Sequence, residues 1–212
     1  MRTITSHLRW EPAPCGRAAE VTRFLRRLLR AVRRGAAAVH SSLLIAWYKC
    51  LYDGLTIGSG VRLRRGVHIS VVQGAVLVIG DRVEIERDCQ LVAEGTLSIG
   101  ADSFVGTGSI IVAAERVIIG KDALIAAYVT IRDQDHKIGA GTPYHRKGLV
   151  TAPVEIGSNV WIGTKASVLR GVTIGDGAVI GAHSLVTAAV EGATLVAGVP
   201  AKLIKRLDEV AS

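Results

Sequence analysis

The stretch VEIGSNVWIGTKASVLRGVTIGDGAVIGAHSLVT, residues 154–187, carries an aliphatic residue at every sixth position. The series runs Ile156, Ile162, Val168, Ile174, Ile180, Val186. A period of six is neither the two-residue alternation of an ordinary strand nor the 3.6-residue turn of a helix. Three hexads make 18 residues, and three short strands joined by corners close one turn of a triangular prism. The stretch therefore predicts a parallel β-solenoid whose coils stack at about 4.8 Å.

The same period continues toward the N-terminus, with insertions. One series of Ile-Gly pairs begins at residues 57, 79, 99, 119, 156 and 174, so its steps are 22, 20, 20, 37 and 18 residues. We interpret the two-residue excess of the early coils as a bulged corner, and we expect about seven coils. The step of 37 residues predicts one long loop thrown out of a rigid column, which is where function is expected.

Composition and cysteine usage agree with a narrow, aliphatic interior. Among 212 residues only 4% are aromatic, and 24 are glycine. Cys15, Cys50 and Cys89 are far apart and match neither a disulfide framework nor a metal-ligand spacing, so a reducing cytoplasm is the expected compartment. The early residues also lack the apolar core of a secretory signal.

The excess positive charge sits in the N-terminal quarter. Residues 1–50 hold ten Lys or Arg against two Glu, whereas the other 162 residues hold 16 basic and 16 acidic groups. In AAEVTRFLRRLLRAVRRG, residues 18–35, apolar residues at three- and four-residue spacings form one helical face and arginines occupy much of the rest. We expect a flexible N-terminus over 1–17 and a basic amphipathic helical segment over 18–52.

Two partners remain open for this helix. A basic amphipathic helix suits the surface of an anionic membrane, but it also suits packing on its own domain or on a neighbouring subunit. Nucleic acid is not expected, because no base-reading motif or aromatic platform accompanies the charge. The apolar run after residue 35 is interrupted by polar residues, so a full membrane span is not expected.

The pattern [LIV]-[GAED]-x-x-[STAV]-x over residues 57–206 resembles the hexapeptide repeat of left-handed β-helix acyltransferases. Two motifs, DQDH at 133–136 and PVEIGSNVWIG at 153–163, are similar to those of the galactoside, maltose and O-antigen polysaccharide O-acetyltransferase branch. The resemblance implies an all-β, left-handed parallel β-helix over 53–200, with an extruded loop at 132–153. It also implies a short C-terminal helix within the tail, 201–212. The left hand is an exception to the right-handed crossover rule.

The loop contains the expected catalytic residue. A sugar hydroxyl is a poor nucleophile, and a histidine with a pKa near 6.5 can remove its proton as it attacks a thioester. The resemblance assigns this general base to His136. Asp133 and Asp135 are expected to orient the imidazole or to contact the acceptor. His145 is expected to be an ordinary loop residue.

A zinc site of the kind found in β-helix carbonic anhydrases needs three imidazoles around an open metal position. The spacing of His136, His145 and His183 does not fit that arrangement. We therefore expect no metal.

The resemblance implies acetyl-CoA as the acyl donor, lying along the C-terminal coils between two subunits of a homotrimer. The corner residues that it implies as contacts are Trp161, Gly163, Thr164, Ala182 and Thr187. Lys202, Lys205 and Arg206 match positions that meet the cofactor phosphates, in agreement with the need of phosphates for exposed cations. Ala188 stands where the family usually has a lysine, which predicts weaker affinity or a different acyl group.

The sequence thus favours an O-acetyltransferase acting on a sugar hydroxyl of a cell-surface polysaccharide or glycolipid precursor, in the cytoplasm and at the inner membrane face. One alternative is a cytoplasmic acetyltransferase of a small free sugar, serine or antibiotic. A non-catalytic β-helix scaffold and a carbonic anhydrase-like protein are further alternatives.

Overall fold

A computed structural model describes residues 16–207, with side chains from residue 26 onward except at 27, 28, 30, 31, 33 and 34. The flexible segment expected at 1–17 therefore falls almost wholly outside the described residues, as does the tail at 208–212. The chain divides into two compact units, residues 1–39 and 40–212. The second unit holds the whole solenoid.

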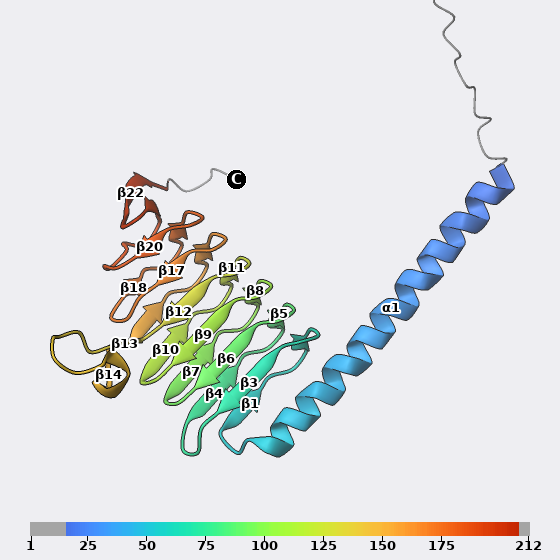
Figure 1. Ribbon diagram of the computed structural model, residues 1–212. Coiled ribbons are helices and arrows are strands. Elements are labelled where there is room, and N and C mark those ends of the chain that lie inside the picture. The colour runs from blue at the N-terminus through green and yellow to red at the C-terminus, as the bar shows by residue number, and fades with distance from the viewer. Residues whose placement is uncertain (1–15, 208–212) are drawn as a thin grey trace, which may run out of the picture. The chain divides into compact units, whose positions relative to one another are not determined.

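The solenoid is built from three parallel sheets that enclose one core (Figure 1). Sheet A contains β1 (Leu55–Ile57), β4 (Val76–Ile79), β7 (Thr96–Ile99), β10 (Arg116–Ile119), β15 (Val154–Ile156) and β18 (Thr173–Ile174). Sheet B contains β2 (Arg62–Leu63), β5 (Glu84–Ile85), β8 (Phe104–Val105), β11 (Leu124–Ile125), β16 (Trp161–Ile162), β19 (Val179–Ile180), β21 (Thr194–Gly198) and β22 (Ala201–Arg206). Sheet C contains β3 (His68–Val71), β6 (Gln90–Ala93), β9 (Ile110–Ala113), β12 (Thr130–Arg132), β17 (Ser167–Val168) and β20 (Leu185–Val186).

The aliphatic residue of each hexad points into this core. In sheet A the register stacks one isoleucine on the next through all six strands, and none of the six is more than 5% exposed: Ile57, Ile79, Ile99, Ile119, Ile156, Ile174. A bridge from the last of them to Val190 adds a seventh coil. The predicted solenoid and its core positions are confirmed.

The two extra residues of the early coils lie where sheet C passes into sheet A. There β3, β6 and β9 each have four residues, and so do the strands that follow them, β4, β7 and β10. The register runs through this extension without a shift, as in the pairs Ser70–Val92 and Val71–Ala93. In the second and third coils the expected bulged corner is replaced by longer paired strands, whereas in the first coil residues 72–75 stand against residues 94–95, so two residues there have no counterpart.

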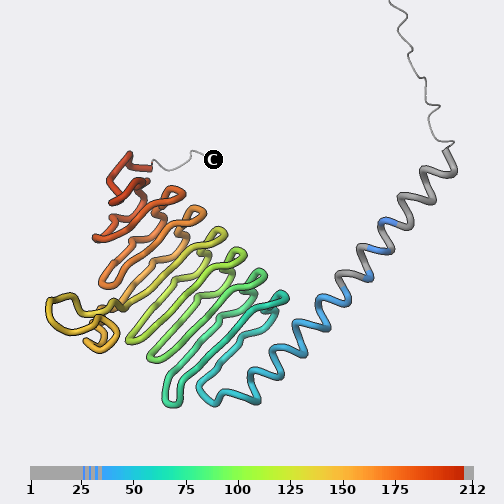
Figure 2. The backbone as a smooth tube through the Cα atoms, in the orientation of Figure 1, coloured from blue at the N-terminus to red at the C-terminus, as the bar shows by residue number. Residues whose placement is uncertain are grey.

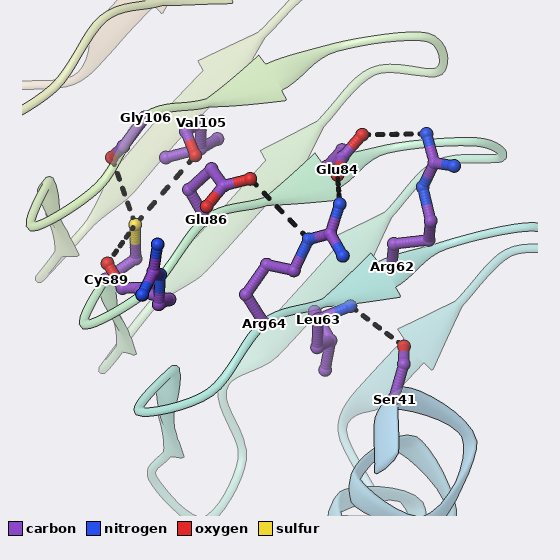
Figure 3. A network of polar contacts seen from close by, with 10 residues as sticks. Ser41, Arg62, Leu63, Arg64, Glu84, Glu86, Cys89, Val105 and Gly106 are labelled. Atoms are coloured by element: carbon purple, nitrogen blue, oxygen red, sulfur yellow. Dashed lines mark hydrogen bonds and ion pairs between the residues drawn. The ribbon is translucent and has the colours of Figure 1, made fainter. Parts of the chain in front are cut away.

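Helix α1 (Gly16–Leu51) occupies the segment expected to be helical, and its last turns close the first coil. The hydroxyl of Tyr48 donates to the carbonyl of Val67 at 3.0 Å and accepts from the N–H of Ile69 at 3.2 Å. The hydroxyl of Ser41 accepts from the N–H of Leu63 at 2.9 Å, as Figure 3 shows. The helix therefore satisfies backbone groups that have no preceding coil to pair with. Within residues 16–207, no helix combines the length and the apolarity that crossing a bilayer requires.

Charged side chains tie the first two coils together on the outer face of sheet B (Figure 3). Glu84 accepts from Arg62 at 2.7 Å and also from Arg64, whose Nε lies 3.5 Å from a carboxylate oxygen of Glu86. These carboxylates and arginines come from neighbouring coils, so the pairs reinforce the stacking from outside. Exposed pairs of this kind contribute about 0–1 kcal/mol each, far less than the aliphatic core.

The C-terminal segment differs from the prediction. Residues 201–206 form strand β22, antiparallel to β21, and not the short helix that was expected. Gly198, at φ 108°, begins the turn that reverses the chain. The last coil has no following coil, and the backbone of β22 pairs with its exposed edge instead. Arg206 fixes the end of the strand through two hydrogen bonds to Glu191, at 2.8 and 2.9 Å, and these bonds lower the pKa of that carboxyl.

The closure of the first coil can be tested at Tyr48. Replacing Tyr48 with Phe removes both hydrogen bonds and leaves the N–H of Ile69 without its partner. We expect the free energy of unfolding to fall by about 1–2 kcal/mol. Chemical denaturation followed by circular dichroism measures this. Tyr52→Phe is the matched control, because Tyr52 stacks on Tyr48 at a ring separation of 6.3 Å and both rings survive the substitution. Equal effects of the two changes would show that the hydroxyl of Tyr48 does not close the coil.

Candidate functional site

The long insertion leaves the column at the corner between sheets C and A, after β12. It runs out as β13 (Gln134–His136), turns through the 3-10 helix η1 (Tyr144–Arg146), and returns as β14 (Leu149–Thr151). The two strands pair antiparallel, so the base of the loop is a short ribbon standing off the column (Figure 2). The coils above and below stay in register across it, as the pairing of Val117 with Val154 shows. The column thus acts as a rigid base for this loop.

Asp133 holds the start of the loop. Its side chain is fully buried, and its two carboxylate oxygens accept three backbone N–H groups, those of residues 114, 115 and 116, each at 2.7 Å. Its backbone carbonyl accepts from the N–H of Ala152 at 2.9 Å, which ties the outgoing chain to the returning chain. Both oxygens are therefore engaged with the corner of the preceding coil, and neither is presented to a ligand. The structure assigns this aspartate to the anchoring of the loop.

Asp135 is exposed and pairs with Arg170, whose Nε lies 3.1 Å from its carboxylate. Arg170 belongs to the C–A corner of the next coil, so this pair fastens the ribbon to the column. Asp135 and His136 are consecutive on β13, and consecutive strand residues point to opposite faces. The expected contact between Asp135 and the imidazole is therefore not present in this arrangement.

His136 lies at the outer end of β13, opposite Leu149 in the ribbon, and its side chain is exposed. Its imidazole makes no hydrogen bond to any other residue in the described part of the chain. An imidazole held on a paired strand, with both nitrogens accessible, can accept a proton from an incoming hydroxyl. The geometry is that of an accessible base without an orienting carboxylate from its own chain.

The tip of the loop is held by its own contacts. The ammonium of Lys147 lies 4.9 Å from the centre of the Tyr144 ring and donates to the carbonyls of Gly139 and Ala140. His145 is exposed within η1, in agreement with its expected role as a loop residue. The tip also displays Ile138, which is 90% exposed.

The expected cofactor corner lies on a different edge, between sheets B and C. Here Gly163 and Thr164 stack directly on Gly181 and Ala182 of the next coil. A Cβ built on Gly163 would lie 2.5 Å from the backbone nitrogen of Ala182, so glycine is needed for this close approach. Trp161 precedes the corner on the outer face of sheet B and is 50% exposed. An exposed indole beside a stack of small corner residues can hold a slender ligand arm against backbone groups.

The two C-terminal lysines lie on the same outer face. In sheet B, Trp161 of β16 stacks on Val179 of β19, and Val179 stacks on Leu195 of β21. Lys205 of β22 is the antiparallel partner of Leu195. Lys202 is paired with Ala197, the residue whose Cβ approaches Gly181. Strand β22 therefore places both lysines at the C-terminal end of sheet B, two strands past the one that carries Trp161 and leads into the expected cofactor corner. Arg206 differs from them, because its guanidinium is already paired with Glu191.

Thr187 does not join this cluster. It follows β20 and lies where sheet C passes into sheet A, which is the edge that also carries the His136 loop. With Ala188 it lines a cavity of about 200 Å³ at the end of the column. The expected site residues are thus divided between two edges of one prism, with the base and Thr187 on one and the remaining cofactor residues on the other.

Three further residues on the B–C edge were not anticipated. Tyr128, Lys165 and His183 occupy the third corner position of successive coils, at φ values of 59°, 60° and 58°. Coils one and three have Gly66 and Gly108 at this position, which the left-handed backbone favours. Bulky side chains held in this conformation often mark binding sites. The second coil has Asp88 at this position, at φ 60°, so glycine is not the rule along this series.

The remaining reactive groups do not form a second site. Cys89 is fully buried, its thiol donates to the carbonyl of Gly106 at 3.1 Å, and burial raises its pKa (Figure 3). A protonated, inaccessible thiol is a core group and not a nucleophile. Within residues 16–207, no three His, Cys, Asp or Glu side chains gather in a way that could hold a metal ion. His136 and His183 lie on different edges of the prism.

Two family models match the chain. Residues 153–188 match the bacterial transferase hexapeptide (six repeats), and residues 96–132 match the hexapeptide repeat of succinyl-transferase. Both matches fall within the coils, on either side of the inserted loop.

Similarity to individual proteins extends over more of the chain. Galactoside O-acetyltransferase of Escherichia coli is 31% identical over 144 residues, which cover 66% of this chain and 68% of the relative. WbbJ, an E. coli protein named for lipopolysaccharide biosynthesis O-acetyl transfer, is 39% identical over 46% of this chain and 54% of its own length. The chain spans about half the length of the first curated relatives that it matches. AntD, an N-acyltransferase from Bacillus cereus, has the same fold, with a TM-score of 0.65 at 23% identity over 76% of this chain and 88% of AntD.

The anchoring role of Asp133 can be separated from a role in chemistry. The carboxylate of Asp133 accepts three backbone N–H groups with two oxygens. Asp133→Asn replaces one of these oxygens with an NH₂ group, which is itself a donor and cannot accept from an N–H. We expect the free energy of unfolding to fall by about 2–3 kcal/mol, with faster amide hydrogen exchange at residues 114–116. Asp135→Asn is the control, because it loses one exposed ion pair and costs about 0–1 kcal/mol. An Asp133→Asn protein of unchanged stability but lower transfer activity would overturn the anchoring role.

Proposed function

We propose that the chain, which belongs to the bacterial hexapeptide-repeat transferase family, is an acetyl-CoA-dependent O-acetyltransferase. The proposed acceptor is a sugar hydroxyl. The observation that carries the proposal is the accessible imidazole of His136 on a ribbon anchored to a rigid column. Family membership supports acyl transfer, and the names of the two E. coli relatives support transfer to an oxygen of a carbohydrate.

In the proposed reaction, His136 removes the proton of the acceptor hydroxyl as its oxygen attacks the thioester carbonyl of acetyl-CoA. A C–O bond forms and the C–S bond then breaks, so the acetyl group moves to the sugar. The thiolate of CoA leaves and takes up the proton that the imidazole holds. No covalent enzyme intermediate is needed, which agrees with the burial of Cys89.

The proposed donor site is the B–C corner of the last coils. Trp161, Thr164 and Ala182 flank the pantetheine arm there, and Gly163 lets the two coils of this corner approach closely. Lys202 and Lys205 meet the phosphates, since exposed ammonium groups on one face suit a polyanion. Lys165, on the same edge as Thr164, supplies a further cation beside the proposed arm.

We further propose that the active protein is a homotrimer. In one chain, His136 and Thr187 lie on the C–A edge, whereas Trp161 and Lys202 belong to sheet B, on the far side of the prism from that edge. A base and a thioester on opposite sides cannot react with each other. Packing the C–A edge of one copy against sheet B of the next would bring them together, and a closed three-fold ring would form three such sites.

The proposed acceptor is a sugar of a cell-surface polysaccharide or glycolipid precursor, modified in the cytoplasm at the inner face of the membrane. Support comes from the name of WbbJ, which refers to lipopolysaccharide biosynthesis, and from the basic charge of the N-terminal quarter. A small free acceptor would need no such charge.

The donor site can be tested by isothermal calorimetry with acetyl-CoA. We expect the wild type to bind and Lys202→Ala/Lys205→Ala to bind at least tenfold more weakly, through loss of two charge-assisted contacts. Lys121→Ala/Arg62→Ala is the matched control, because it removes the same charge from other coils. No binding by the wild type would reject the donor, and equal weakening by both pairs would reject the site.

The base and the trimer can be tested together by release of CoA thiol, with a galactoside as acceptor probe. We expect His136→Ala to lose about 10²–10⁴-fold in rate, and His145→Ala to stay near the wild type. When His136→Ala chains are mixed with Lys202→Ala/Lys205→Ala chains and reassembled, shared sites predict recovery to about a quarter of wild-type activity. Mixed assemblies no more active than the average of their two parents, at an acetyl-CoA concentration that does not saturate the lysine variant, would show that each site is built from a single chain.

A further inference from the structure

The last turns of α1 carry two apolar faces, and the solenoid uses only one of them. Within the second unit, Tyr48 and Ser41 bond to the first coil, and Leu44 and Ile45 pack against the core. These residues lie on one side of the helix, at three- and four-residue spacings. This face is fully accounted for by its own domain.

The opposite side of the same turns is apolar and uncovered. Leu43, Trp47 and Leu51 follow one another at four-residue spacing and are 67%, 64% and 53% exposed. The described part of the chain leaves more than half of each side chain uncovered. Three large exposed apolar residues in a row are unusual on a soluble surface and mark an interaction site.

The first unit shows the same property. Leu29, Val32 and Val39 are large apolar residues of α1, and each is more than half exposed. Within the first unit these residues are three and seven apart, which is the spacing of one helical face. We call the three exposed residues of the second unit, Leu43, Trp47 and Leu51, the α1 stripe.

The charge along the same helix points to the partner of the α1 stripe. Between residues 16 and 34 the helix sequence holds seven arginines and a single glutamate. A second copy of the chain would bring like charges together along the helix, which opposes pairing of two such segments. Nucleic acid would account for the arginines but not for the exposed leucines and tryptophan. An anionic bilayer surface accounts for both, because its headgroups attract arginine and its outer acyl region accepts apolar side chains.

We propose that the α1 stripe docks the protein on an anionic lipid bilayer, with the helix lying in the headgroup region. Trp47 fits this position, since an indole ring favours the boundary between headgroups and acyl chains. The proposal supplies the membrane contact that a lipid-linked acceptor calls for. It does not depend on the transfer chemistry, so a failure of either leaves the other standing.

The test is co-sedimentation of the full-length protein with two kinds of vesicle. One is pure phosphatidylcholine, and the other contains phosphatidylglycerol and phosphatidylcholine in a ratio of 3:7. We expect binding to the anionic vesicles to be at least tenfold tighter and to weaken as salt is raised. Leu43→Ser/Trp47→Ser/Leu51→Ser should bind anionic vesicles at least tenfold more weakly than the wild type. The matched control is Val72→Ser/Val76→Ser/Ile138→Ser, which removes three exposed aliphatic residues outside the proposed donor site and should bind as the wild type does.

Acetyl-CoA binding and thermal unfolding of both triple variants should match the wild type, which shows that they are folded. Undiminished vesicle binding by the α1 triple variant would overturn the proposal. So would equal binding of the wild type to neutral and anionic vesicles. A change of oligomeric state in the α1 triple variant without lipid, measured by sedimentation velocity, would assign the stripe to another copy of the chain and would also overturn it.

Discussion

Hydrogen bonding between successive coils is the constraint on which the structure depends. Each strand of a sheet pairs with the equivalent strand of the next coil, so backbones must approach to the parallel-strand spacing of about 4.8 Å at every level, corners included. This requirement explains glycine at positions such as Gly163, where a Cβ would collide with the backbone below. It also explains the aliphatic columns, because stacked identical positions fill one continuous interior. Site geometry follows from the same rule, since corners that stack in register align their side chains along an edge.

A stack of coils has two open ends, and the chain closes them in different ways. At the first coil, hydroxyls of α1 take the place of a missing strand, through Tyr48 and Ser41. At the last coil, β22 folds back on β21 and its end is fixed by the pair of Arg206 and Glu191. Both closures block the edges at which such a sheet would otherwise pair with other chains. Both also have a second proposed use, since α1 displays an apolar stripe and β22 displays two lysines.

The period of six sufficed to predict the fold and the core, because one buried position per hexad leaves a direct trace in the sequence. The location of His136 on a projecting loop followed from the single long step in that period. The role of Asp133 could not be predicted, because its partners are backbone N–H groups some 17 to 19 residues earlier, and backbone groups leave no sequence signal. The C-terminal strand was missed for a related reason: the need to close an edge belongs to the stack and not to residues 201–206 themselves. The division of the site between two edges required the order of the three sheets.

The loop enters and leaves the column without disturbing the register of the coils on either side. Thirty-seven residues separate Ile119 from Ile156, against 18 for the next step, yet both isoleucines stack as neighbours in sheet A. The entropy of closing a loop grows only with the logarithm of its length. Lengthening or shortening this segment beyond its Asp133 anchor therefore has little bearing on whether the column folds. Such an architecture lets the scaffold be inherited separately from the proposed acceptor side, so that exchange of this one segment could change specificity while the proposed donor edge is kept.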